Sequence, residues 1–334
     1  MERARSTPPG PPSWAATLLT WVVPGAGHVL LGATRTAALA FLVVEGLYLL
    51  GFLLSSGLVY EFLDPELRGR FALVLTPEFG NLGALLAHQM IEPLGAASAS
   101  IAPPRPPSTV HLGAALTAAS GVLNLALMAH AHLLARSSDE ASRGIADRTG
   151  LALAAGWALP GAGHWLQGRA RRGVVVLGVA LVLFVIGSVL AEGTNLSREH
   201  HFYYWSGQFL VGAPAFVAET LRGHPPLGEV PGQLDVGLFY VCLAGLLNGL
   251  VLIDVFAWGE SRALGADPVE DRRAMAAHRR DAKKRGRSSE DGARGAKAGA
   301  SPASKHLVTA APVAADDADA GDGTGDAEAD EEQR

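Results

Sequence analysis

Long apolar runs dominate the first three quarters of the chain, and they lack the polar stripe of an amphipathic helix. A helix needs about 20 such residues to cross a bilayer core. The run at 36–59, for example, is interrupted by one charged residue, Glu45. The strong runs are 36–59, 110–135, 173–191 and 234–258. This pattern predicts an all-α, polytopic helical membrane protein rather than a water-soluble fold.

Four further segments make the number of crossings harder to predict. Residues 14–31 and 150–168 are long and apolar enough to span, but each contains a Pro-Gly break. Residues 71–91 and 205–221 carry several polar side chains and are more typical of amphipathic helices in the membrane interface. We therefore expect about six spanning helices, within a range of four to eight. With six, the two halves of the protein would be inverted.

An internal repeat organises these segments. The stretch WVVPGAGHVLLG, which begins at Trp21, returns as WALPGAGHWLQG from Trp157, and GVLN at 121–124 returns as GLLN at 245–248. A tandem duplication explains both matches. The predicted organisation is a flexible N-terminus (1–13), membrane repeat 1 (14–135), a polar linker (136–149), membrane repeat 2 (150–258) and a disordered, charged tail (259–334).

The PGAGH motif predicts a kinked or re-entrant helix packed tightly on its neighbours. Proline removes a backbone hydrogen bond, and glycine strips side chains from one face. In lipid, the freed carbonyls must find other partners. The candidate residues of the two motifs are Pro24, Gly25, Gly27, His28, Gly32, Pro160, Gly161, Gly163, His164 and Gly168.

The motif histidines have three interpretations. We favour His28 and His164 as caps of the broken helices. Alternatively they are proton or metal ligands, with Asp254, His130 and His132 as companions, because an ionisable group at membrane depth suggests function. Against metal binding, no zinc-type spacing is present, and we assign no metal or catalytic residue. The third interpretation is contact with a lipid headgroup or a substrate.

Polar and small residues in the last helix of each copy are best explained by helix packing. Asn124 and Asn248 are expected to form interhelical hydrogen bonds. Stripes of small residues, Gly113-Thr117-Gly121 and Gly245-Gly249, allow close approach of backbones. We expect these stripes to pack within the chain rather than in a dimer.

Overall, 49% of the 334 residues are hydrophobic and 18% are charged, and the charge is concentrated in the tail. The tail's basic cluster includes Arg279, Arg280, Lys283, Lys284, Arg285 and Arg287. By the positive-inside rule the tail is cytoplasmic, and we expect it to contact anionic lipid. No aromatic residues accompany the cluster, which disfavours nucleic acid. The acidic end, from Asp316, is too poor in apolar residues to fold.

The combination of PGAGHxxxG, a long helix and a terminal GLLNxxxxxD resembles a family of uncharacterised bacterial inner-membrane proteins, here in two copies. More distantly, LPGAGHWLQGRARRG is similar to the glycine-rich motif of the two-transmembrane-helix domain. Copy one departs from the pattern, with Ala33-Thr34-Arg35-Thr36 in place of 169–172 and His130 in place of an acid. The resemblance implies a multi-pass protein of the bacterial inner membrane, but no activity.

The sequence contains no GxSxG, HExxH, P-loop or paired-carboxylate motif, so we expect neither an enzyme nor a cofactor. The favoured function is a non-enzymatic membrane scaffold or assembly factor, acting with a protein partner or as a homo-oligomer. The alternative is a small transporter or channel built on broken helices. An intramembrane enzyme that uses the histidines is a third hypothesis.

Overall fold

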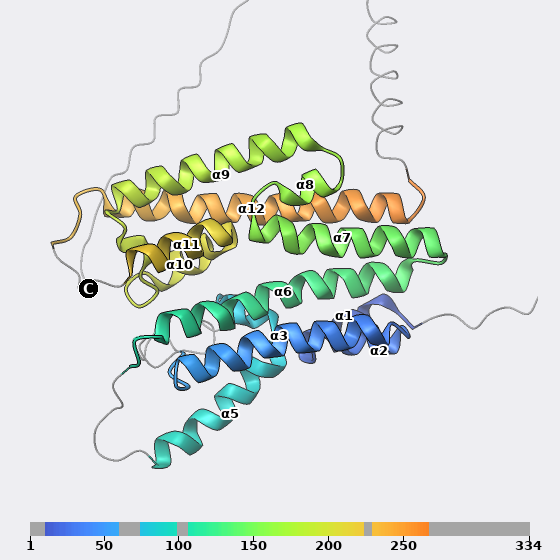
Figure 1. Cartoon of the computed structure of the whole chain (residues 1–334), viewed down its shortest axis with the longest axis horizontal. Helices are drawn as coiled ribbons and strands as arrows, with labels where there is room; N and C mark the ends of the chain where they lie inside the picture. Colours follow the sequence, from blue (N-terminus) through green and yellow to red (C-terminus); the bar gives the residue numbers. More distant parts are fainter. Residues whose placement is uncertain (1–10, 60–73, 99–105, 224–228, 267–334) are drawn as a thin grey trace, which may run out of the picture. The chain divides into compact units, whose positions relative to one another are not determined.

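The computed structural model describes residues 11–59, 74–98, 106–223 and 229–266. Every regular element in this part of the chain is helical, and the protein is an all-α helical membrane protein. Figure 1 shows the arrangement. The α-helices are α1 (Ser13–Val22), α2 (Ala26–Leu30), α3 (Thr34–Leu54), α5 (Leu82–Ser98), α6 (Val110–Arg136), α7 (Glu140–Ala158), α8 (Ala162–Leu166), α9 (Ala170–Leu190), α10 (Phe202–Gln208), α11 (Ala213–Arg222) and α12 (Leu234–Ala263). Short 3-10 turns are η1 (Pro77–Gly80), η2 (Thr194–Leu196) and η3 (Phe209–Val211).

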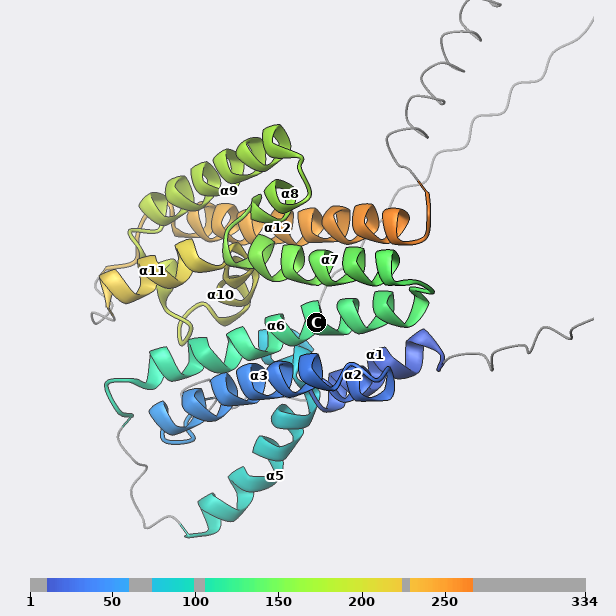
Figure 2. The same cartoon turned by 45° about the vertical axis from the view of Figure 1, so that its right-hand side comes forward.

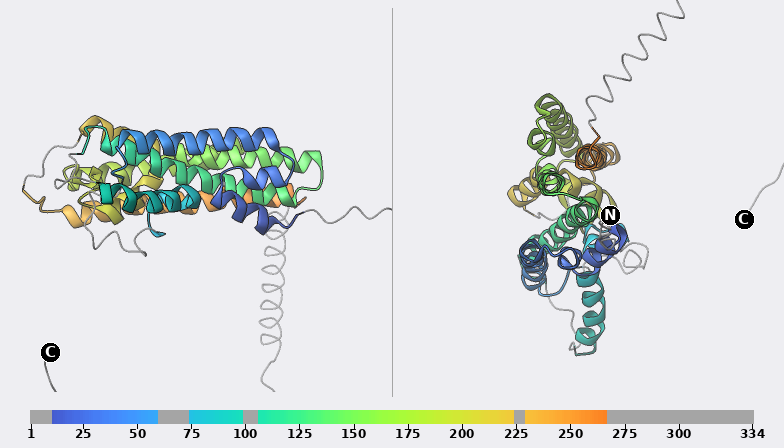
Figure 3. Two further views of the ribbon diagram at one scale, coloured as in Figure 1. Left: turned by 90° about the horizontal axis from the view of Figure 1, so that it is seen from below. Right: turned by 90° about the vertical axis from the view of Figure 1, so that its right-hand side faces the viewer.

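Four of the described helices, α3, α6, α9 and α12, are long and apolar enough to cross a membrane. They correspond to the four strong runs of the sequence. Within each copy the first long helix lies against the last, and the long helices run side by side in Figures 2 and 3. Four is the lower end of the predicted range.

The two copies point the same way. One apolar cluster contains Leu31 and Ala33 before α3, Leu133 near the end of α6, and Ala263 at the end of α12. The last helix of each copy therefore finishes at the same end of the bundle, which we call the hairpin end. The inverted arrangement that six crossings required is wrong for this structure.

The Pro-Gly segments turn back on themselves within the helical bundle. Val23 and Leu159, which precede the prolines, have extended backbones and end α1 and α7. The short helices α2 and α8 then return along α1 and α7. Gly27, for example, lies against the backbone of Ala16. Each PGAGH motif is the turn of a re-entrant helical hairpin.

Two other expectations need correction. The predicted polar linker is mostly the start of α7, because the carboxylate of Asp139 accepts a hydrogen bond from the Ser142 N–H (2.7 Å) and caps that helix. In the weaker segments, 71–91 and 205–221, no described helix is long and apolar enough to span, and the described residues do not lie wholly on the surface. Parts of them enter the bundle, where Glu78, Asn81 and Glu219 are buried.

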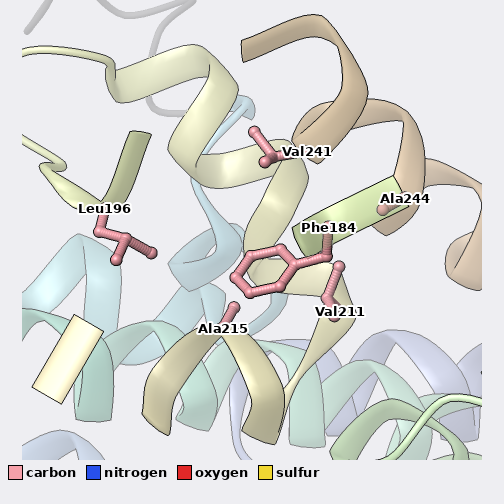
Figure 4. Close-up of a cluster of buried hydrophobic side chains, with 6 residues drawn as sticks. All are labelled: Phe184, Leu196, Val211, Ala215, Val241 and Ala244. Atoms are coloured by element: carbon pink, nitrogen blue, oxygen red, sulfur yellow. The ribbon is translucent and has the colours of Figure 1, made fainter. Parts of the chain in front are cut away.

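Close backbone contacts hold each copy together. In copy one, a Cβ on Gly113 would lie 2.5 Å from the Gly51 carbonyl oxygen, and in copy two a Cβ on Gly237 would lie 2.6 Å from that of Gly187. In the small-residue stripes, Gly121 and Gly245 likewise lie against backbone carbonyls of their own copies, so the stripes pack within the chain. Around the second contact, Phe184 lies among the small and branched side chains drawn in Figure 4, which are Leu196, Val211, Ala215, Val241 and Ala244.

Candidate functional site

Each re-entrant hairpin is held by an asparagine that satisfies the carbonyl freed by the proline. The N–H of residue 24 would bond the Thr20 carbonyl in a continuous helix, but Pro24 has none. Asn124 Nδ2 donates to the Thr20 oxygen instead (2.9 Å) and also to the Gly80 oxygen (2.9 Å). Without this donor the buried carbonyl would have no hydrogen-bond partner among the apolar helices, so the amide stabilises the break in the helix.

Copy two repeats the arrangement atom for atom. Pro160 frees the Gly156 carbonyl, to which Asn248 Nδ2 donates (3.1 Å), and the same amide donates to the Leu210 oxygen (2.8 Å). Trp21 and Trp157 add matching bonds from their indole N–H to the carbonyls of Phe79 and Phe209. Both asparagines are buried.

The glycines of each motif allow three different features of the hairpin: the start of the return helix, its end, and the close approach of the two arms. Gly25 and Gly161 have φ of 84° and 85°, a left-handed conformation that begins the return helix. Gly32 and Gly168, both at φ 75°, end it. A Cβ on Gly27 would lie 2.0 Å from the Ala16 carbonyl oxygen, so only glycine allows the two arms to meet.

In copy one, His28 begins a chain of three ionisable side chains at the hairpin end. Its Nε2 lies 3.0 Å from Nδ1 of His130, whose Nε2 lies 2.9 Å from a carboxylate oxygen of Asp147 in α7. Because the carboxylate can only accept, His130 donates through Nε2 and His28 donates to His130. His28 is fully buried, and burial next to His130 lowers its pKa to about 4.

In copy two, His164 contacts an acid directly. Its Nε2 lies 3.2 Å from Oδ2 of Asp254, and Arg169 Nη1 lies 2.6 Å from the same oxygen. Asp254 aligns with His130, so the same two helix positions meet in both copies. Burial and the Arg169 charge lower the pKa of His164. Nδ1 of both motif histidines is buried and has no hydrogen-bond partner among the described residues.

These contacts can be compared with the three interpretations of the motif histidines. The histidines bond side chains, and the asparagines bond the broken backbone, so the expectation that His28 and His164 cap the helix is wrong. Two of the proposed companions, His130 and Asp254, do meet the motif histidines. The third, His132, points elsewhere: its Nε2 is 3.8 Å from Glu260, which also pairs with Arg136. Within the described ranges, no group of three His, Cys, Asp or Glu side chains could hold a metal.

A buried ion pair that no sequence motif indicated joins the two copies. Arg198, which precedes α10, makes two bonds to the Glu78 carboxylate (2.8 and 3.2 Å). Thr117 donates to the same carboxylate (3.0 Å), and both charged residues are at most 1% exposed. Nearby, the Glu219 carboxylate accepts a hydrogen bond from the indole N–H of Trp205. Burial raises the pKa of Glu219 to about 7. Glu78 and Arg198 stand 120 residues apart in the sequence, in segments that no motif connects.

Three pockets open around the hairpin half of the molecule. One, of about 390 Å³, lies between α3, α6 and α7 and reaches His130 and Asp147. A second, of about 370 Å³, is almost wholly apolar and lies between α6, α7 and α12. A third, of about 440 Å³, is lined by the arginines at 169–172 and by Trp258. The predicted basic cluster at 279–287 lies outside the described residues.

A family model matches this chain twice, over residues 15–142 and 151–268, and its description is "Family of unknown function (DUF6677)". Together the two matches cover most of the chain. The protein belongs to the DUF6677 family. The double match confirms that an uncharacterised domain is present as two tandem copies. No curated protein and no solved structure matches the chain.

Proposed function

We propose that this DUF6677 protein is a non-enzymatic scaffold or assembly factor of the bacterial inner membrane. The observation that carries the proposal is the use of the interior polar groups. Asn124 and Asn248 donate hydrogen bonds to the protein's own backbone, and Glu78 forms an ion pair with Arg198. Such contacts support a rigid helical body rather than a changing path through it.

The charge distribution supports a cytoplasmic hairpin end. Described arginines at that end are Arg35, Arg136, Arg143, Arg148, Arg169, Arg171, Arg172 and Arg262, against Arg198 and Arg222 at the other end. This asymmetry follows the positive-inside rule. Because α12 finishes at the hairpin end, the proposal predicts that the charged tail follows on the cytoplasmic side and recruits a soluble partner there.

A small transporter is the second candidate, and the broken helices favour it. Half-helices that end near the midplane form substrate sites in many carriers, including carriers with parallel repeats. The unpartnered Nδ1 atoms of His28 and His164 would be the first groups to examine in such a site.

Thiol accessibility separates the two candidates. In a Cys242→Ser background, His28→Cys would be treated with a small charged thiol reagent from each face of the membrane. A scaffold predicts no labelling of this buried position, whereas His132→Cys, at the half-exposed position in the same region, labels readily. Labelling of His28→Cys in the folded protein would contradict the scaffold and favour a water-filled path.

A further inference from the structure

The turn between α8 and α9 forms a basic pocket at the hairpin end. It is an open pocket, lined by Gly168, Arg169, Ala170, Arg171 and Arg172 and by Trp258 of α12. The pocket volume is about 440 Å³, enough for a phosphate group with its substituents. It is separate from the contacts that hold the hairpin, which lie deeper between α7 and α12.

The pocket holds more positive than negative charge. Arg169 is committed to Asp254 (2.6 Å), and its guanidinium stacks over Trp258, 4.6 Å from the ring centroid. Arg172 reaches the same carboxylate only at 3.8 Å. Arg171 forms no salt bridge with any residue the structure describes. Three guanidinium groups face one carboxylate, which leaves a net charge of about +2, since burial keeps His164 neutral.

We propose that this pocket binds the phosphate of an anionic glycerophospholipid. Arginine suits this task because its planar fork matches phosphate oxygens, and two exposed arginines on one turn can contact one phosphate. The proposal does not depend on whether the protein is a scaffold or a transporter.

The surroundings of the pocket favour a lipid over a soluble phosphate compound. The arginines stand at the first turn of the spanning helix α9, at the level where headgroups lie. Directly below them, Leu166, Val174 and Val175 are more than half exposed, and they form an apolar surface for acyl chains. A lipid would use both features, whereas a soluble phosphate would use the arginines alone.

Copy one provides an internal comparison. Ala33, Thr34 and Thr36 stand where copy two has Arg169, Ala170 and Arg172, and Arg35 aligns with Arg171. The hairpin is nevertheless the same in both copies. The basic pocket is therefore an addition to the second hairpin and is not needed to form it.

The test is lipid binding to the full chain in a neutral detergent, measured by native mass spectrometry. Phosphatidylglycerol and phosphatidylcholine would be titrated into wild type and Arg171→Gln/Arg172→Gln. The matched control is Arg35→Gln, at the equivalent turn of copy one. We expect the double variant to weaken phosphatidylglycerol binding about tenfold to thirtyfold and the control to leave it unchanged. The tail is present in all three proteins, so its own lipid contacts cancel.

Three results would overturn the proposal. Equal phosphatidylglycerol affinity in the double variant and wild type would show that Arg171 and Arg172 do not bind the lipid. Binding of phosphatidylcholine to wild type as tightly as phosphatidylglycerol would show that the site does not recognise headgroup charge. Competition by glycerol phosphate at the concentration at which phosphatidylglycerol binds would make the site one for a soluble phosphate. Because both arginines are exposed, the double variant should keep its fold, and Arg171→Lys/Arg172→Lys, which keeps the charge, should recover part of the affinity.

Discussion

The two copies share every device that shapes the backbone and differ in the ionisable groups around it. Pro24 and Pro160 each end a helix, and Asn124 and Asn248 each satisfy the carbonyl so freed. By contrast, the motif histidine meets an imidazole in copy one and a carboxylate in copy two. The half-helix geometry therefore needs the proline, glycines and asparagine, and it tolerates different chemistry at the histidine contact.

A second difference lies at the opposite end of the bundle. Glu78 in copy one aligns with Gln208 in copy two, since both precede the Phe whose carbonyl accepts from the tryptophan. Glu78 pairs with Arg198 of the other copy, whereas Gln208 bonds Asn195 of its own copy. Divergence at this position gave copy one a bond that fixes the two copies to each other.

The largest effect is expected from breaking that ion pair. Arg198→Met leaves the Glu78 carboxylate buried without its partner and should lower the free energy of unfolding by about 3–5 kcal/mol. Adding Glu78→Leu should recover most of the loss, because neither charge of the pair then remains buried. Gln208→Leu, at the neutral counterpart, should cost less than Arg198→Met. Denaturation in mixed micelles measures all three, and an equal cost for Arg198→Met and Gln208→Leu would show that the pair is unimportant.

Close backbone contact should make Gly27 the next most sensitive position. Gly27→Ala places a methyl group 2.0 Å from the Ala16 oxygen, whereas in Gly163→Ala the corresponding distance, to the Ala152 oxygen, is 2.6 Å. Both should destabilise by about 1–3 kcal/mol, Gly27→Ala by more. The control is Gly46→Ala, where nothing lies within 4 Å, and it should be neutral or slightly stabilising. Thermal unfolding of the three variants gives the order, and a tolerated Gly27→Ala would contradict the tight hairpin.

Removal of the asparagine amides should have similar, smaller effects in the two copies. Asn124→Leu and Asn248→Leu each leave two carbonyls without a donor, and hydrogen bonds between membrane helices average about 0.6 kcal/mol each, with a maximum near 1.7. We expect a loss of about 1 kcal/mol for each variant in the same denaturation measurement. A large difference between the two would show that the hairpins are not equivalent.

The smallest effect expected is a difference in acid sensitivity. Because His28 has a folded pKa of about 4 against an ordinary value of 6.5, the unfolded state binds the extra proton, and stability is lost as the pH falls between these values. His28→Gln should therefore flatten the fall in melting temperature over this range. His164→Gln should flatten it less, since the Asp254 carboxylate partly offsets the effects of burial and of the Arg169 charge, which lower the pKa of His164. Equal flattening by both variants would argue against distinct environments.

Much of the fold could be predicted from the sequence because it rests on local rules. The length of the apolar runs predicts the four spanning helices, and the paired motifs predict the duplication. Pro24 and Gly25 predict an interruption of the first helix. The direction taken after the break could not be predicted, because a kinked crossing and a re-entrant turn share the same local pattern. The choice depends on Asn124, a hundred residues away. The Glu78–Arg198 pair was missed for the same reason, since burial of a charge depends on which loops meet.

The side of the membrane reached by the two turns after the hairpins tests the central claim most directly. Thr34→Cys and Ala170→Cys, exposed and equivalent positions at the first residues of α3 and α9, would be labelled singly in intact cells in a Cys242→Ser background. Ser108→Cys and Glu199→Cys serve as controls for the opposite end. Re-entrant hairpins in parallel copies predict that Thr34→Cys and Ala170→Cys label from one side and both controls from the other. Labelling of Thr34→Cys and Ala170→Cys from opposite sides would contradict the account.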